Sequence, residues 1–264
     1  MELEYDCKND DEMKRPLQTT FLIAFLLLSG CGKNGPDCLQ SSGDILREEL
    51  ALPAFQNITV FENVRLVVRY GAQQQVIVET GENLRPDVSA QVVDGTLELR
   101  DQNNCNYFRA YGRTTFHVTT PDLRVLRSST GWPIQSDGIL PFPELSLVSE
   151  SFNNPEAETT DGSFDLEVDS DRVSVVANGI AYFRLRGQTG VFAITIAAGD
   201  SRIEAEGLVA GTVELNHRGS NDILVAPIQR ISGVIRGYGD VLSYSRPPEV
   251  EVEETFRGRL IFVD

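Results

Sequence analysis

Alternating apolar and polar residues dominate the chain after residue 50. β-Branched residues are frequent in these stretches, and turn residues such as Gly71, Gly81 and the pair Asp94-Gly95 separate them. Because successive side chains of a strand point to opposite faces, this alternation predicts strands with one buried face. The strands expected in the first half are 58–61, 64–68, 76–80, 88–93 and 96–100. No stretch beyond residue 50 follows a helical period, so the sequence predicts an all-β fold.

A repeat of about 20 residues appears in the second half of the chain. In each unit an apolar residue lies four positions after a turn residue, which is glycine in four units of five. The apolar positions are Phe164, Phe183, Ile203, Ile223 and Val241, and the turn positions are Thr160, Gly179, Gly199, Gly219 and Gly237. Units this short cannot bury an apolar face alone, whereas stacked units bury a continuous ladder of like residues.

The repeat therefore predicts a β-solenoid with rungs of about 20 residues and with glycine at corners of positive φ, preceded by more irregular N-terminal strands. An antiparallel sandwich with evenly spaced hairpins is the alternative. At the C-terminal end, Pro247-Pro248 breaks the repeat, and residues 249–253 alternate glutamate with valine. Prolines and edge charges of this kind predict a cap that stops the last strand from pairing with another molecule.

The most apolar stretch of the chain lies near its start, at residues 19–28. It is too short to cross a bilayer as a permanent helix, which needs about 20 apolar residues, but it has the length of a signal-peptide core. The sequence Leu28-Ser29-Gly30-Cys31 that ends it resembles the bacterial lipobox, in which the cysteine thiol receives a diacylglycerol. The pattern predicts a signal peptide over residues 1–30 and lipidation of Cys31. A buried helix with an incidental cysteine is the alternative.

The residues around this segment refine the prediction. Residues 1–12 are strongly acidic, whereas a signal peptide begins with positive charge, as Met13-Lys14-Arg15 does. We therefore expect Met13 to be the true initiator and residues 1–12 to be an extension of the gene model. Gly32 follows Cys31 in the place of an aspartate that retains some lipoproteins at the inner membrane, so we expect an outer-membrane lipoprotein.

Charge and composition narrow the classes of partner. The chain has 23 basic and 39 acidic residues, of which three basic and six acidic residues lie in residues 1–30. The remainder has 20 basic and 33 acidic residues, which gives a net charge of −13. This charge argues against nucleic acid as a partner and against electrostatic attraction to anionic lipid.

Turn formers over residues 31–46 predict a tether at 31–54. A β-domain is expected at 55–264, and it could consist of two sub-domains that meet near residues 130–160.

Two cysteines remain after Cys31, namely Cys38 and Cys105. Export to an oxidising compartment permits a disulfide between them, which would connect the tether to the β-domain. Two free thiols are the alternative.

A family resemblance rests on the corner sequences. Gly219-Ser220-Asn221-Asp222-Ile223 and Gly237-Tyr238-Gly239-Asp240-Val241, with Gln75 to Glu79, Asp94 to Leu97 and Thr119 to Leu123 upstream, resemble the head GIN domain family. That family carries the label "putative auto-transporter adhesin" and is common in lipoproteins of Bacteroidetes. The resemblance covers about residues 55–263 and implies a right-handed, parallel β-helix-like fold. It departs from the family at Asn221, where glycine is usual, and at residues 128–132, where another such corner would be expected. It brings neither a known activity nor catalytic residues.

Candidate chemistry centres on two carboxylates. Asp222 and Asp240 each lie directly before the inward apolar residue of their unit, so they are expected to stack on adjacent rungs. A pair of this kind could bind calcium or act as acid and base, but aspartate at a turn more simply accepts backbone N–H groups. We favour the second interpretation, and we predict no metal and no cofactor.

Other polar and aromatic residues give weaker signals. The only histidines are His117, expected on a strand, and His217, expected on the surface at a corner. An aromatic group could stack sugar rings or pack in the core, and it consists of Tyr107, Phe108, Tyr111 and Trp132.

These observations predict a lipid-anchored cell-envelope protein that is not an enzyme and that binds a glycan or a protein by its extended surface. A polysaccharide-active enzyme that uses stacked carboxylates, and a structural or regulatory envelope protein, are the alternatives.

Overall fold

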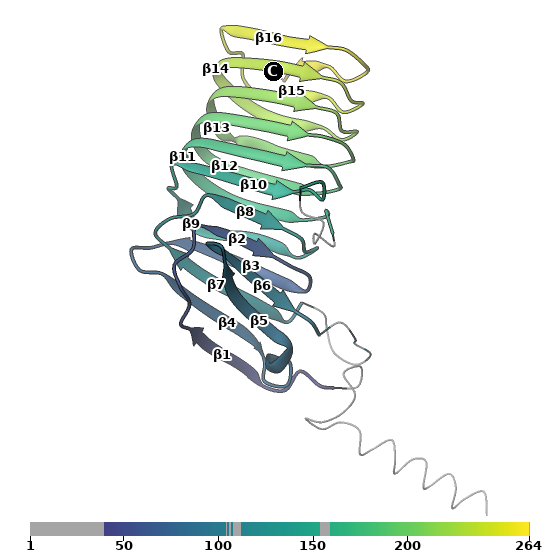
Figure 1. Ribbon diagram of the computed structural model, residues 1–264. Helices are drawn as coiled ribbons and strands as arrows, with labels where there is room; N and C mark the ends of the chain where they lie inside the picture. Colours follow the sequence, from purple (N-terminus) through teal and green to yellow (C-terminus); the bar gives the residue numbers. More distant parts are fainter. Residues whose placement is uncertain (1–39, 104, 106, 108–111, 154–158, 264) are drawn as a thin grey trace, which may run out of the picture. The chain divides into compact units, whose positions relative to one another are not determined.

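The computed structural model describes residues 40–103, 105, 107, 112–153 and 159–263 (Figure 1). The predicted signal peptide lies outside these residues, as do residues 31–39 of the predicted tether at 31–54. The chain divides into two compact units, and the larger, Ser42–Asn104 with Tyr111–Asp264, contains all the strands described below. It consists of one sheet of 17 strands, and the only helical element in the described residues is a 3-10 turn, η2 (Arg85–Asp87). The all-β prediction is confirmed.

The strands fall into an N-terminal set and a C-terminal set, and the second set contains the longest strands. The first set is β1 (Ile45–Leu50), β2 (Asn57–Val60), β3 (Val64–Tyr70), β4 (Gln75–Gly81), β5 (Val88–Val93), β6 (Thr96–Asp101), β7 (Thr114–Thr120), β8 (Val125–Ser128) and β9 (Pro133–Leu140). The second set is β10 (Glu144–Ser149), β11 (Ser163–Ala177), β12 (Tyr182–Ile196), β13 (Arg202–His217), β14 (Ile223–Ile235), β15 (Val241–Ser243), β16 (Glu249–Glu254) and β17 (Leu260–Phe262).

The second set stacks in parallel at the predicted repeat. Pairing of β11, β12, β13, β14 and β15 aligns the five repeated apolar residues in one row, and all five are fully buried. The rings of Phe164 and Phe183 stack with centroids 4.8 Å apart. Each rung thus buries its apolar row against the next, which is the arrangement that the repeat predicts. Figure 1 shows these strands lying one above another toward the β16 end.

The sheet as a whole is mixed, so a parallel solenoid throughout is not confirmed. Antiparallel pairs join β1 to β4, β4 to β7 and β5 to β6. The last pair has a local cause, because Asp94 (φ 49°) and Gly95 (φ 74°) form a tight turn with two positive φ angles between its strands. Turns of this kind match the twist of a two-stranded hairpin and reverse the chain at once.

The corner near residue 130 is built from buried hydroxyl groups instead of glycine. Ser128, Ser129 and Thr130 are fully buried. The Thr130 hydroxyl donates to the Val64 carbonyl at 3.1 Å, and the Ser128 hydroxyl donates to the Thr130 carbonyl at 3.1 Å. Side-chain bonds therefore satisfy the buried backbone at this departure from the repeat.

Corner glycines explain the regular spacing of the second half. Gly199 has φ +84°, and a Cβ atom there would clash with the carbonyl oxygen of Gly179 on the preceding rung. The same clash would arise at Gly237 against Gly219. The predicted positive φ is found at Gly199 but is wrong at Gly179, Gly219 and Gly237, where close approach to the neighbouring rung is the reason for glycine. Only glycine allows the turns of successive rungs to approach this closely.

Candidate binding groove and corner carboxylates

Asp222 and Asp240 lie on adjacent rungs, and each accepts a backbone hydrogen bond from the rung that follows. The Asp240 amide donates to Asp222 Oδ1 at 3.0 Å, and the Arg259 amide donates to Asp240 Oδ1 at 2.8 Å. The other Asp222 oxygen lies 3.9 Å from Arg202 Nη1. The two carboxylates therefore connect successive corners by capping backbone N–H groups.

These hydrogen bonds give the carboxylates of Asp222 and Asp240 a structural role. An acid–base pair needs two carboxyl groups that face a cleft with room for a substrate. In the part of the chain that the structure describes, no three His, Cys, Asp or Glu side chains gather where they could hold a metal ion.

His217 lies inside the corner, so its predicted surface position is wrong. Its side chain is fully buried, and neither ring nitrogen makes a hydrogen bond within the described residues. Burial lowers the pKa of His217, and the nearby backbone of Asn221 and Gly239 and the carboxylates of Asp222 and Asp240 offset only part of this effect. The signal was present in the sequence, because the alternation of β13 places position 217 on the inward face.

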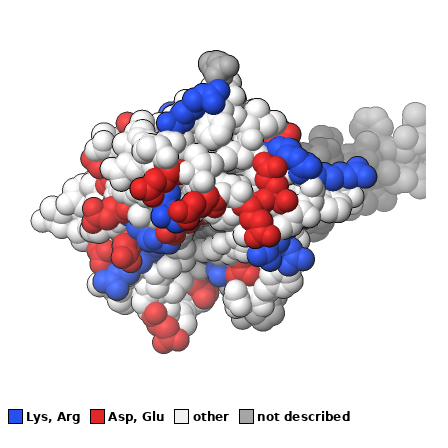
Figure 2. Space-filling view, turned by 90° about the horizontal axis from the view of Figure 1, so that it is seen from above, with Lys and Arg blue, Asp and Glu red and all other residues white. Residues whose placement is uncertain are grey.

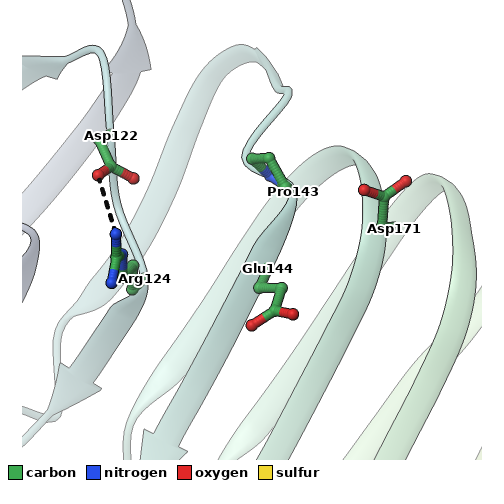
Figure 3. Close-up of a pocket in the computed structure, with 5 residues that line it drawn as sticks. All are labelled: Asp122, Arg124, Pro143, Glu144 and Asp171. Carbon is green, nitrogen blue, oxygen red and sulfur yellow. Dashed lines mark ion pairs between the residues drawn. The ribbon is translucent and has the colours of Figure 1, made fainter.

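An open groove crosses β8, β10 and β11, as the close-up shows (Figure 3). Two adjoining hollows of about 280 and 270 Å³ share Arg124 and Glu144. The parallel register β8–β10–β11 brings these side chains together from three rungs, with Glu144 directly opposite Arg172. Each hollow is slightly smaller than a typical small-molecule pocket of about 300 Å³ or more, so each has room for a group of the size of one sugar ring.

The groove carries charges of both signs. Asp122 accepts a hydrogen bond from Gln56 at 2.6 Å and lies 3.8 Å from Arg124. Arg172 reaches across β12 to Glu214 at 2.9 Å. Within the described residues, the carboxylates of Glu144 and Asp171 have no hydrogen-bond or ion-pair partner, so they are available to a ligand.

The sequence did not locate this groove. Glu144, Asp171 and Arg124 look like ordinary solvent-facing residues of separate strands, and only the register of the stacked rungs brings them together. The predicted aromatic group is not seen as a platform. Trp132 is half-buried under the Arg65 guanidinium, 4.2 Å from its ring centroid, Tyr107 is exposed, and Phe108 and Tyr111 lie outside the described residues.

Two of the predicted covalent sites lie outside the described residues, namely Cys31 and Cys38. Cys105 is disulfide-bonded. Its pairing with Cys38 stays a prediction.

The fold and the groove define an all-β protein with stacked strands and an open, polar outer surface. The chain belongs to the head GIN domain family, because the family model described as "putative auto-transporter adhesin, head GIN domain" matches residues 54–247. This confirms the resemblance found in the corner sequences. No curated protein gives a significant match.

Solved structures share the fold at low identity. A "putative adhesin" from Bacteroides fragilis is 17% identical, with a TM-score of 0.72 over 83% of this chain and 97% of that one. Two proteins from Parabacteroides distasonis are each 14% identical over 84% of this chain and 98% of theirs. One is called a "putative adhesin", with a TM-score of 0.59, and the other a "putative lipid binding protein", with a TM-score of 0.57.

Proposed function

We propose that this chain is a lipid-anchored, non-enzymatic protein of the cell envelope that binds a glycan through the groove across β8, β10 and β11. The observation that carries the proposal is the pair of partnerless carboxylates, Glu144 and Asp171, in an open groove beside Arg124. Carboxylates accept and guanidinium groups donate hydrogen bonds, and sugar hydroxyls can meet both needs.

The choice of binding over catalysis rests on the corner carboxylates. One carboxylate oxygen of Asp222 and one of Asp240 each accept a hydrogen bond from a backbone N–H group. The groove residues come from different rungs and lie along its length, which suits a polymer chain laid across the stack. Membership of an adhesin-like family supports the same class of function.

A glycan array on the full chain, extracted from membranes in detergent, tests this function. We expect binding to hydroxyl-rich glycans that Glu144→Gln with Asp171→Asn weakens about tenfold or more, because hydrogen bonds to charged groups contribute about 1.5–3 kcal/mol each. The matched control is Glu206→Gln with Glu253→Gln, which removes two exposed charges outside the groove. An array without binding, or equal binding by both double variants, contradicts the proposal.

The anchor is proposed from the lipobox-like sequence at Leu28 to Cys31. No helix among the described residues is long and apolar enough to span a membrane. We place the protein at the outer membrane, and the adhesin-like family supports a location in the cell envelope. Cys31→Ala should move the chain from the membrane fraction to the soluble fraction, whereas Cys38→Ala should not. Unchanged fractionation of Cys31→Ala would exclude the lipid anchor without bearing on the groove.

We also infer that the parallel rungs from β10 onward wind as one right-handed solenoid. Their pairing at steps of about 20 residues supports this inference, and crossovers between parallel strands are right-handed in about 98% of cases.

A further inference from the structure

Two arginines of like charge stack at the corner after β13 and β14. Arg218 is the residue after the end of β13, and Arg236 is the residue after the end of β14. The last residues of these strands, His217 and Ile235, lie opposite each other. The Arg236 amide donates to the His217 carbonyl at 2.7 Å. The two therefore hold equivalent positions on successive rungs, about 4.8 Å apart along the stack. Both side chains are exposed.

This pair is unusual in a chain with a net charge of −16. Like charges at directly opposite positions destabilise a sheet, and neither guanidinium has an ion-pair or hydrogen-bond partner in the part of the chain that the structure describes. Arg186 and Arg230, which are also exposed to solvent in part, both have carboxylate partners. Arg218 and Arg236 thus have no carboxylate at ion-pair distance among the described residues, whereas Arg186 and Arg230 do.

An exposed aromatic side chain, Tyr238, follows Arg236 by two residues and packs on Phe256. Tyr238 and Phe256 are 59% and 47% exposed, and their rings meet edge to face with centroids 5.0 Å apart. The Arg257 guanidinium lies 5.3 Å from the Tyr238 ring centroid. The Tyr238 amide donates to the Gly219 carbonyl at 3.0 Å, so the backbone that carries the ring is bonded to the preceding corner.

We propose that this corner binds an acidic saccharide, with Arg218 and Arg236 on the carboxylate of a uronate unit and Tyr238 against the apolar face of its ring. The planar guanidinium matches a carboxylate through two parallel hydrogen bonds, and an aromatic side chain offers a flat apolar surface with a polar tip. The bound carboxylate relieves the repulsion between the two arginines, which a neutral sugar cannot do. The corner shares no residue with the groove, so this is a second site.

Calorimetry tests the proposal with the full chain in detergent carrying Glu144→Gln with Asp171→Asn, so that the groove proposed for hydroxyl-rich glycans contributes little. Oligogalacturonate is the probe, and dextran oligomers of equal length are the neutral comparison. Oligogalacturonate should bind at least tenfold more tightly than dextran. Arg218→Gln with Arg236→Gln should weaken its binding about tenfold or more, while the melting temperature stays equal or rises because the repulsion is removed. Tyr238→Ala should also weaken binding with both arginines present.

A control variant separates this site from net charge. In the same background, Arg186→Gln with Arg230→Gln removes the same charge elsewhere and should leave the affinity for oligogalacturonate nearly unchanged. The proposal is overturned if dextran binds as well as oligogalacturonate, or if the Arg186 and Arg230 control weakens binding as much as the corner variant. It is also overturned if sulfated oligosaccharides bind more tightly than oligogalacturonate, because the corner would then select sulfate.

Discussion

At the scale of single residues, the most buried ion pair among the described residues joins Arg127 to Glu150. Arg127 Nη1 lies 3.0 Å from Glu150 Oε1, and their side chains are 15% and 3% exposed. The other Glu150 oxygen accepts the Phe152 and Asn153 amides at 2.7 and 3.0 Å. Burial raises the pKa of Glu150, but these amides and Arg127 lower it by more, so the net pKa lies below the ordinary value. Glu150 therefore stays ionised and fixes the start of the loop after β10.

We expect Glu150→Gln to lower the free energy of unfolding by about 3 kcal/mol, because it leaves a largely buried guanidinium without its charge partner. Urea denaturation measures the change. The control is Glu214→Gln, which breaks a pair of about half-exposed residues with Arg172 and should cost less than about 1 kcal/mol. Equal losses in the two variants would show that burial does not set the value of this pair.

His217 gives the molecule a pH-dependent stability. Because burial lowers its pKa in the folded state, the unfolded chain takes up the proton more readily than the folded one. Its contribution to stability is therefore complete above the unfolded pKa of about 6.5 and is lost as the pH falls below that value. Urea denaturation between pH 7.5 and 5.5 should show this loss in the parent chain and in His117→Gln, and much less in His217→Leu. A decline of the same size in His217→Leu would assign it to other groups.

At the scale of elements, the strands and the stacking were visible in the sequence because both follow from periods along the chain. The alternation with a period of two residues predicted the strands. The repeat with a period of about 20 residues predicted that Phe164, Phe183 and Ile203 align. The hairpin of β5 and β6 was also signalled by Asp94-Gly95, a turn that favours antiparallel pairing. The repeat of about 20 residues begins only near residue 160, so it carries no information about this hairpin.

Two glycines of positive φ, Gly199 at a corner and Gly138 within β9, allow conformational strain to be separated from contact between rungs. Gly199 and Gly138 have φ of +84° and +86°, but a Cβ would clash with a carbonyl only at Gly199, and at Gly138 it would meet nothing within 4 Å. Gly138→Ala should cost about 1–2 kcal/mol from its left-handed backbone alone. Gly199→Ala should cost clearly more and lower the melting temperature further. Equal costs would mean that the rungs move apart without penalty.

At the scale of the whole molecule, the sites were harder to predict than the fold. Arg124, Glu144 and Asp171 are far apart in sequence, and each resembles a solvated residue of its own strand. Their proximity depends on which rung pairs with which, namely β8 with β10 and β10 with β11. On the end seen in Figure 2, acidic and basic side chains lie side by side, so net charge alone did not reveal where ligands could bind.

The β16 end of the sheet is open, and its charges are expected to keep it from pairing with a second copy. β16 pairs with β14 alone among the described strands, and Glu251 contacts Arg230 while Val250 is 45% exposed. An exposed edge offers unpaired backbone groups to another chain, and like charges along it oppose the approach of an identical edge. Glu251→Gln with Glu253→Gln should therefore produce concentration-dependent dimers in sedimentation velocity. Glu206→Gln with Glu214→Gln removes the same charge from β13, within the stack, and should stay monomeric. If both variants associate equally, net charge and not the edge controls association, and if neither does, the edge is protected by its geometry instead of by its glutamates.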